Sequence, residues 1–232
     1  MLSLFLLPLL PRSSAGAQAK DAPPYAVMAP VAEYRIADAK DEIALARTAA
    51  PPSISANATV LVLGTRGYET AVKGGNGFVC FVERSWDAGF DDPEFWNPKT
   101  RGPDCLNAAA VRSVLPQFMK RTEWALAGLD KVRIMAKVRE ALASHEFVEP
   151  EAGSLSFMLS KQGYLNGADG PWLPHVMYFV PHGQAALWGA GLEGSPVIGK
   201  DGGPLEPTVL VVPVRRWSDG STALPKGEHQ HH

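Results

Sequence analysis

The apolar positions of the first half of the chain change from a helical to an extended pattern near residue 58. Segments 58–64, 67–73 and 77–83 are rich in β-branched and aromatic residues, and short connections next to glycines separate them. This pattern is typical of β-hairpins and predicts a three-strand antiparallel meander. The first and third segments are apolar on both faces, as central strands covered by helices are.

A helical period precedes these strands. Segment 38–50 can begin with Asp38 or Asp41 as its N-cap, because a carboxylate there accepts hydrogen bonds from the first free backbone N–H groups. Two prolines, Pro51 and Pro52, follow the segment and are expected to end the helix.

Three more helices are predicted in the middle of the chain. Asn107, Ser113 and Asp130 are suitable N-caps for them, and Gly128 separates the second from the third. The expected buried stripes are Val114, Phe118, Leu126 and Leu129 in the second helix, and Val132, Met135, Val138 and Leu142 in the third.

The last third returns to strand patterns at 155–160, 175–180 and 208–214, separated by glycine-rich loops. The predicted fold is therefore α+β: an antiparallel sheet, made of the N-terminal meander and the C-terminal strands, with helices packed on one face. The length suits a single domain, 20–232, with a loosely ordered lead at about 20–37 and tail at about 222–232.

The chain begins with an apolar block, MLSLFLLPLL, that is too short to span a bilayer as a helix. Two small-x-small sites follow, ending at Ala17 and Ala19, as in a secretory signal peptide, although no basic residue precedes the block. The alternative is a buried N-terminal helix, which Pro8 and Pro11 disfavour. We expect residues 1–19 to be removed, leaving a periplasmic or secreted protein without stable membrane insertion.

Cysteine usage agrees with export. The chain has two cysteines, Cys80 and Cys105, which an oxidising compartment would join in a disulfide. Buried free thiols or a metal pair are the alternatives, but the pair lacks the Cys-x-x-Cys spacing of zinc and thioredoxin-like sites.

Composition excludes few functions. Of the 232 residues, 46% are hydrophobic and 20% are charged, which is typical of a globular protein. The formal net charge of -2 provides no basic surface for nucleic acid, so we expect no nucleic-acid partner. Signatures of common hydrolases, zinc proteases, dinucleotide-binding proteins and EF-hands are absent from the sequence.

An acidic and aromatic loop is predicted over 85–106. It carries five carboxylates and four large aromatic residues: Asp87, Asp91, Asp92, Glu94, Asp104, Trp86, Phe90, Phe95 and Trp96. Such loops can bind calcium or stack on sugar rings, but the spacing matches no calcium loop. We expect instead that the aromatic side chains pack the loop onto the sheet, and we assign no metal ligand.

Two histidines, His175 and His182, lie at the two ends of a predicted strand. Their odd spacing places them on opposite faces, and a straight strand would separate them by about 23 Å, too far to share one ion. His175 follows a loop that contains Lys161 and Tyr164, so it could act as an acid or base with either of them. The alternative is a structural histidine bonded to the backbone, which is the commoner case.

Several blocks together resemble a family of exported bacterial proteins of unknown function. They are NGFVCFVERSW, FDDPEFWNPK, SKQGYL, PHVMYFVP and RWSDGS, and the resemblance extends from about Ala44 to Ser221. The resemblance implies bacterial origin, export and a single domain, and it implies no catalytic residues.

Two classes of function follow from these observations. We expect a domain that binds an unknown small molecule or protein through its aromatic and glycine-rich loops. The alternative is an exported enzyme with His175, Lys161 and Tyr164 as its catalytic residues. The sequence specifies no cofactor for either.

Overall fold

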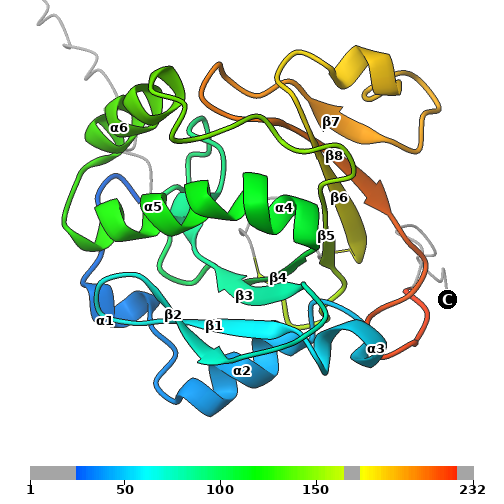
Figure 1. The fold of residues 1–232 in the computed structure, drawn as a ribbon, viewed down its shortest axis with the longest axis horizontal. Coiled ribbons are helices and arrows are strands. Elements are labelled where there is room, and N and C mark those ends of the chain that lie inside the picture. Colours follow the sequence, from blue (N-terminus) through cyan, green and yellow to red (C-terminus); the bar gives the residue numbers. More distant parts are fainter. Residues whose placement is uncertain (1–24, 165–172, 224–232) are drawn as a thin grey trace, which may run out of the picture.

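The computed structural model describes residues 25–164 and 173–223 (Figure 1). The predicted signal peptide, residues 1–19, and most of the predicted C-terminal tail lie outside the described residues. Within them, no helix has the length and apolar character needed to cross a bilayer.

All eight strands of the described residues belong to one sheet, in the order β2-β1-β3-β4-β5-β6-β8-β7. The pairings are antiparallel except between β1 and β3. The strands are β1 (Thr59–Leu63), β2 (Tyr68–Val72), β3 (Val79–Glu83), β4 (Gly102–Leu106), β5 (Leu155–Met158), β6 (His175–Val180), β7 (Ile198–Lys200) and β8 (Thr208–Pro213). A mostly antiparallel sheet with separate helices confirms the α+β class.

The predicted meander is not confirmed in its strand order. β1 and β2 form a hairpin, but β3 lies on the other side of β1 and runs parallel to it, with Thr59 beside Val79. The burial patterns agree with this arrangement. All five residues of β3 are buried, as in a central strand, whereas three of the five residues of β2 are exposed, which suits an edge strand.

Helices cover both faces of the sheet, so the predicted one-sided packing is not confirmed. The helices are α1 (Val31–Tyr34), α2 (Ala39–Arg47), α3 (Pro52–Ser55), α4 (Ala108–Ser113), α5 (Leu115–Leu126) and α6 (Lys131–Ala143). Figure 1 shows α4 and α5 on one side of β3 and β4 and α2 on the other.

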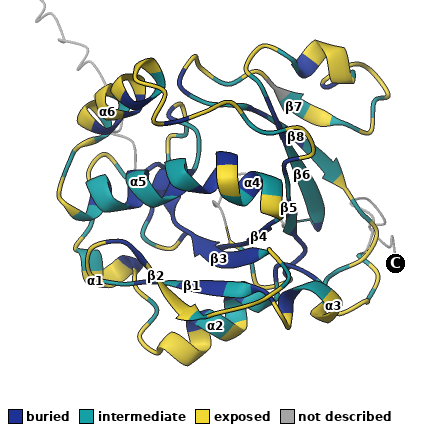
Figure 2. Ribbon diagram, viewed as in Figure 1, coloured by how far each residue is buried: buried dark blue, intermediate teal, exposed yellow. Residues whose placement is uncertain are grey.

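Side-chain alternation along β3 produces these two packed faces. Phe81 belongs to the larger core cluster, together with Phe118 of α5. Its neighbours Cys80 and Val82 point the other way and belong to a second cluster with Ala46 of α2. In Figure 2, β3 and β4 are buried throughout while the outer side of α2 is exposed. A strand that is apolar on both faces therefore has a helix on each, as the sequence pattern of β3 indicates.

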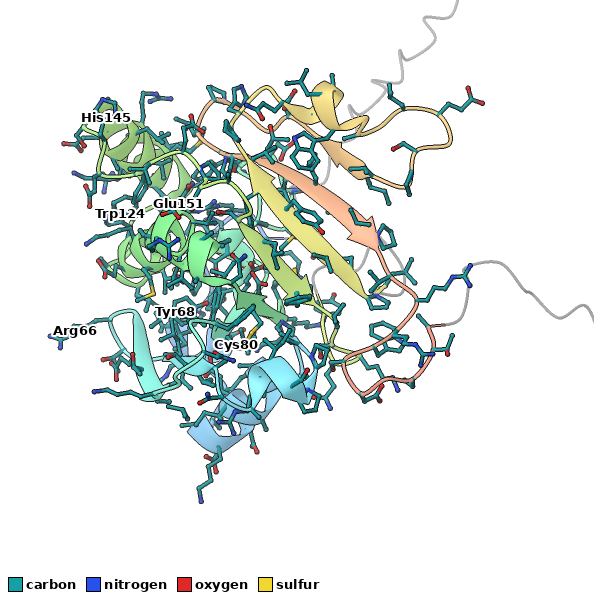
Figure 3. All side chains as sticks on the ribbon, turned by 45° about the vertical axis from the view of Figure 1, so that its right-hand side comes forward. Arg66, Tyr68, Cys80, Trp124, His145 and Glu151 are labelled. Carbon is teal, nitrogen blue, oxygen red and sulfur yellow. A yellow bond between two sulfur atoms is a disulfide. The ribbon has the colours of Figure 1, made fainter. Side chains whose placement is uncertain are left out.

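The strand β4 lies where the sequence predicts a loop. Its sequence, GPDCL, contains Gly, Pro and Asp, which are rare in strands, and it has no alternating pattern. It pairs along its whole length with β3, and Cys105 lies directly opposite Cys80. The two cysteines form the predicted disulfide, which Figure 3 shows beside Cys80 in the interior.

Three of the predicted N-caps are confirmed. The side chains of Asp38, Asn107 and Asp130 accept backbone N–H bonds at the starts of α2, α4 and α6. The cap predicted at Ser113 is wrong. Ser113 ends α4, and its hydroxyl donates to the carbonyl of Ala109 instead.

Candidate small-molecule pocket

A pocket of about 290 Å³ lies on the face of the sheet that α5 covers. Phe179 of β6 and Val209 of β8 are paired neighbours, and Val211 lies two positions further along β8 on the same face. Val114 and Phe118, at and after the start of α5, face them from the helix. This wall is apolar, as small-molecule pockets commonly are.

Polar side chains complete the wall of the pocket. Asp87 and Asp91 come from the loop that follows β3, Gln117 and Arg121 lie one turn apart on α5, and Glu206 comes from the loop before β8. The charged members of the wall are therefore three carboxylates and one guanidinium. The loop after β3 and the loop before β8 meet directly, where the N–H of Phe90 donates to Glu206 at 2.7 Å.

Arg121 is a buried cation at this wall. Only 3% of its surface is exposed, its guanidinium lies 4.3 Å from the centre of the Phe90 ring, and it donates to the carbonyl of Ala88. Desolvation lowers its pKa, but an arginine remains charged at neutral pH. Its Nε has no hydrogen-bond partner within residues 25–164 and 173–223.

Asp87 is a buried carboxylate at the same wall, with 8% of its surface exposed. Its Oδ2 accepts the N–H of Arg84 at 2.9 Å and the hydroxyl of Tyr68 at 3.3 Å. Its Oδ1 has no partner in the described part of the chain. Desolvation outweighs these contacts and raises the pKa of Asp87 to about 6.

Two further buried carboxyl groups, Glu83 and Asp104, lie on the same face of β3 and β4. Asp104 is opposite Phe81, and Glu83 is two residues further along β3, so both side chains point toward the α5 side. Desolvation raises the pKa of Asp104 to about 7, and desolvation together with the nearby Asp104 raises that of Glu83 well above its usual value. Each of these two carboxyl groups therefore keeps its proton to a higher pH than a carboxyl group in water does.

The three residues predicted as catalytic have separate contacts. Lys161 forms an exposed ion pair with Asp219 at 2.7 Å. Tyr164 forms an isolated backbone bridge with Arg101, and its side chain is exposed. The Nδ1 of His175 bonds the carbonyl of Leu173 at 2.8 Å, and desolvation lowers the pKa of the imidazole. The acid-base role of these three residues therefore stays a prediction.

His175 and His182 are separated as the strand spacing predicts. His175 begins β6 and pairs with Pro213, whereas Val180 at the other end pairs with Thr208, and His182 lies beyond it. Among the described residues, no group of three or more His, Cys, Asp or Glu side chains could hold a metal ion.

The aromatic residues of segment 85–106 pack onto the sheet, as expected. Trp86, Phe90, Phe95 and Trp96 are all at least 92% buried. In the sequence, Asp87 is only one of several acidic residues of this loop, and no motif distinguishes Arg121, Glu83 or Glu206. The signal that could have found Arg121 is its position three residues after Phe118 on the apolar face of a helix.

No protein-family model, curated protein or solved structure matches the chain. The family resemblance therefore stays a prediction.

Proposed function

We propose that the protein is an exported binding protein that holds a small molecule in the pocket between α5 and strands β6 and β8. The observation that carries the proposal is the pocket itself, because an apolar wall with a few buried polar groups is the usual form of a small-molecule site. Asp87 and Arg121 support it, since both are charged residues that line the pocket and are almost completely buried.

The proposed location is the periplasm or the outside of a bacterial cell. The disulfide between Cys80 and Cys105 supports an oxidising compartment. The signal-like segment at residues 1–19 and the resemblance to exported bacterial proteins support the same location.

The test of binding is a screen of chemically diverse small molecules by thermal shift, repeated on a variant with a filled pocket. Val211→Phe places a larger side chain in the wall, so compounds that stabilise the native protein should lose their effect. Val132→Phe on α6 is the matched control, because Val132 is 74% exposed and distant from the pocket wall.

Overpacking can itself destabilise the protein, so each variant is first compared by circular dichroism and by its melting temperature without ligand. If Val211→Phe unfolds, Val209→Phe replaces it. Binding that persists in a folded, filled variant would contradict the proposed site.

An enzyme is the second candidate, and Asp87 favours it. A carboxyl group at a pocket wall with a pKa of about 6 can exchange protons near neutral pH. The earlier candidate, His175 with Lys161 or Tyr164, is tested by His175→Ala. Loss of turnover or binding with unchanged stability would support a functional histidine. A structural histidine should instead cost about 1–3 kcal/mol of stability.

A further inference from the structure

We propose that the ligand of this pocket is a small organic amine, protonated and attached to an apolar body. The amine would lie at the acidic wall formed by Asp87, Asp91 and Glu206, and the apolar body would lie against β6 and β8. This inference rests on the proposed binding function of the same pocket and names the chemical class that the pocket accepts.

The charge of the wall favours a cation. Three carboxylates face one guanidinium, so the wall has an excess of negative charge when Asp87 is ionised. Arg121 is already engaged by the Ala88 carbonyl and the Phe90 ring, and the charges of Asp87 and Glu206 act on it. An entering carboxylate would meet net repulsion, whereas an ammonium group would meet net attraction that the low-dielectric surroundings strengthen.

Because Asp87 is buried, a cation beside it would stabilise its carboxylate more than it would stabilise a carboxylate on an open surface. Asp87 as a residue is 92% buried, and while Oδ2 accepts two hydrogen bonds, Oδ1 has no partner in the described residues. The N–H of Arg84, the hydroxyl of Tyr68 and the charges of Arg121 and Arg84 offset this desolvation only in part, because the pKa of Asp87 is still raised to about 6. The positive charge of an ammonium group would stabilise the ionised form further.

The apolar wall determines the chemical character of the part of the ligand beyond the amine. Phe118, Phe179, Val209 and Val211 offer ring and branched side chains from three elements but no donor or acceptor. A ligand that is polar over its whole surface would lose its hydration there without replacement. An aromatic or aliphatic body with one amine therefore fits both parts of the pocket.

Three matched probes test the inference by NMR titration of the full chain: 2-phenylethylamine, the neutral 2-phenylethanol and the anionic 3-phenylpropionate. The amine should bind at least ~10-fold more tightly than either of the others, which corresponds to about 1.4 kcal/mol. Its binding should disappear in Val211→Phe.

Two neighbouring carboxylates provide a matched pair of variants. Asp91 lines the pocket, whereas Asp92 does not and instead accepts the N–H of Glu94 at 2.7 Å. Asp91→Asn should weaken amine binding several-fold and leave 2-phenylethanol binding unchanged, and Asp92→Asn should change neither. Asp87→Asn should weaken the amine further, by ~10-fold, and the Asp91 and Asp92 variants decide the matter if Asp87→Asn does not fold.

The outcomes separate the two proposals. If 2-phenylethanol or 3-phenylpropionate binds as tightly as the amine, and Val211→Phe still blocks it, the amine inference is overturned and the binding function stands. If neither these probes nor a diverse library shows binding that depends on Val211, both proposals are overturned.

Discussion

Glu42 and Arg84 form an ion pair that is almost completely buried, with their nearest atoms 2.8 Å apart. Glu42 also accepts the N–H of Leu63, and Arg84 donates to the carbonyls of Tyr34 and Val82. These contacts tie α2 and the end of α1 to the sheet. Because a buried charge is costly without its partner, each residue depends on the other.

The first prediction concerns this pair. Glu42→Gln should lower the free energy of unfolding by about 3–5 kcal/mol, because it removes the ion-pair partner of the buried Arg84 charge. The control is Glu151→Gln, which breaks an exposed pair with Arg112 and should cost about 0–1 kcal/mol. Urea denaturation of both variants measures the difference, and equal losses would contradict the burial argument.

The second prediction concerns Asp104 and the dependence of folding stability on pH. Glu83 and Asp87 are its charged neighbours, and desolvation raises its pKa to about 7. A raised carboxyl pKa stabilises the folded state at low pH, and this contribution is lost as the pH rises through about 7. Asp104→Asn mimics the protonated form and should remove this loss.

The variant should therefore be more stable than the native protein at pH 8, by about 4 kcal/mol at most, and similar to it near pH 4. Urea denaturation across this range is the measurement. Glu69→Gln on the exposed face of β2 serves as the control and should leave the pH dependence unchanged. Parallel curves for the native protein and Asp104→Asn would contradict the assignment.

In helix α6 the buried stripe lies on a different part of the helix surface from the stripe that the sequence predicts. The stripe predicted from Val132, Met135, Val138 and Leu142 includes Val132, which is 74% exposed, and misses Ile134, which is fully buried. The buried positions are Ile134, Val138 and Ala141, with the helical spacing of four and three. The face that packs was set by contact with neighbouring elements, since apolar residues occur on two sides of this helix.

The third prediction uses this difference within one helix. Ile134→Ala should cost about 2–5 kcal/mol, because it removes a buried side chain and leaves a cavity. Val132→Ala should change stability by less than about 0.5 kcal/mol, as exposed substitutions do. Thermal and urea denaturation compare the two, and a larger loss at Val132 would place the inner face of α6 elsewhere.

The disulfide joins neighbouring strands and closes segment 80–105, and it leads to the fourth prediction. Reduction should destabilise the protein by about 3.5 kcal/mol if the bond acts by restricting the unfolded chain. Urea denaturation of the oxidised and the reduced native sequence isolates this contribution without changing any side chain. A reduced protein of equal stability would show that packing around Cys80 and Cys105 is sufficient.

The fifth prediction is that the chain is exported from the cytoplasm with cleavage of its N-terminal segment. When the full sequence is expressed in a bacterium, the exported protein should begin just after Ala17 or Ala19 and contain no free thiol. N-terminal sequencing and non-reducing mass spectrometry measure both. A chain without residues 1–19 is the control and should stay in the cytoplasm with reduced cysteines. Exported material with two free thiols would contradict the oxidising compartment.

Local patterns determined the secondary structure of most elements and one covalent bond. The apolar runs at β1, β3, β6 and β8 are strands, Asp38, Asn107 and Asp130 cap helices, and Cys80 is joined to Cys105. These features depend on neighbouring residues, or on there being two cysteines, so the sequence by itself specifies them.

Tertiary contact decided what local patterns leave open. β4 forms from a sequence with low strand propensity because β3 and β5 offer backbone partners on both sides. β3 lies on the far side of β1 and parallel to it, an order that the strand patterns do not specify, and α2 covers its second face. The sequence did not reveal the candidate site either, because tertiary contacts bring its residues together. Asp87, Arg121 and Glu206 are far apart in the chain, and the shifted pKa values of Asp87 and Arg121 arise only where the fold removes these two groups from water.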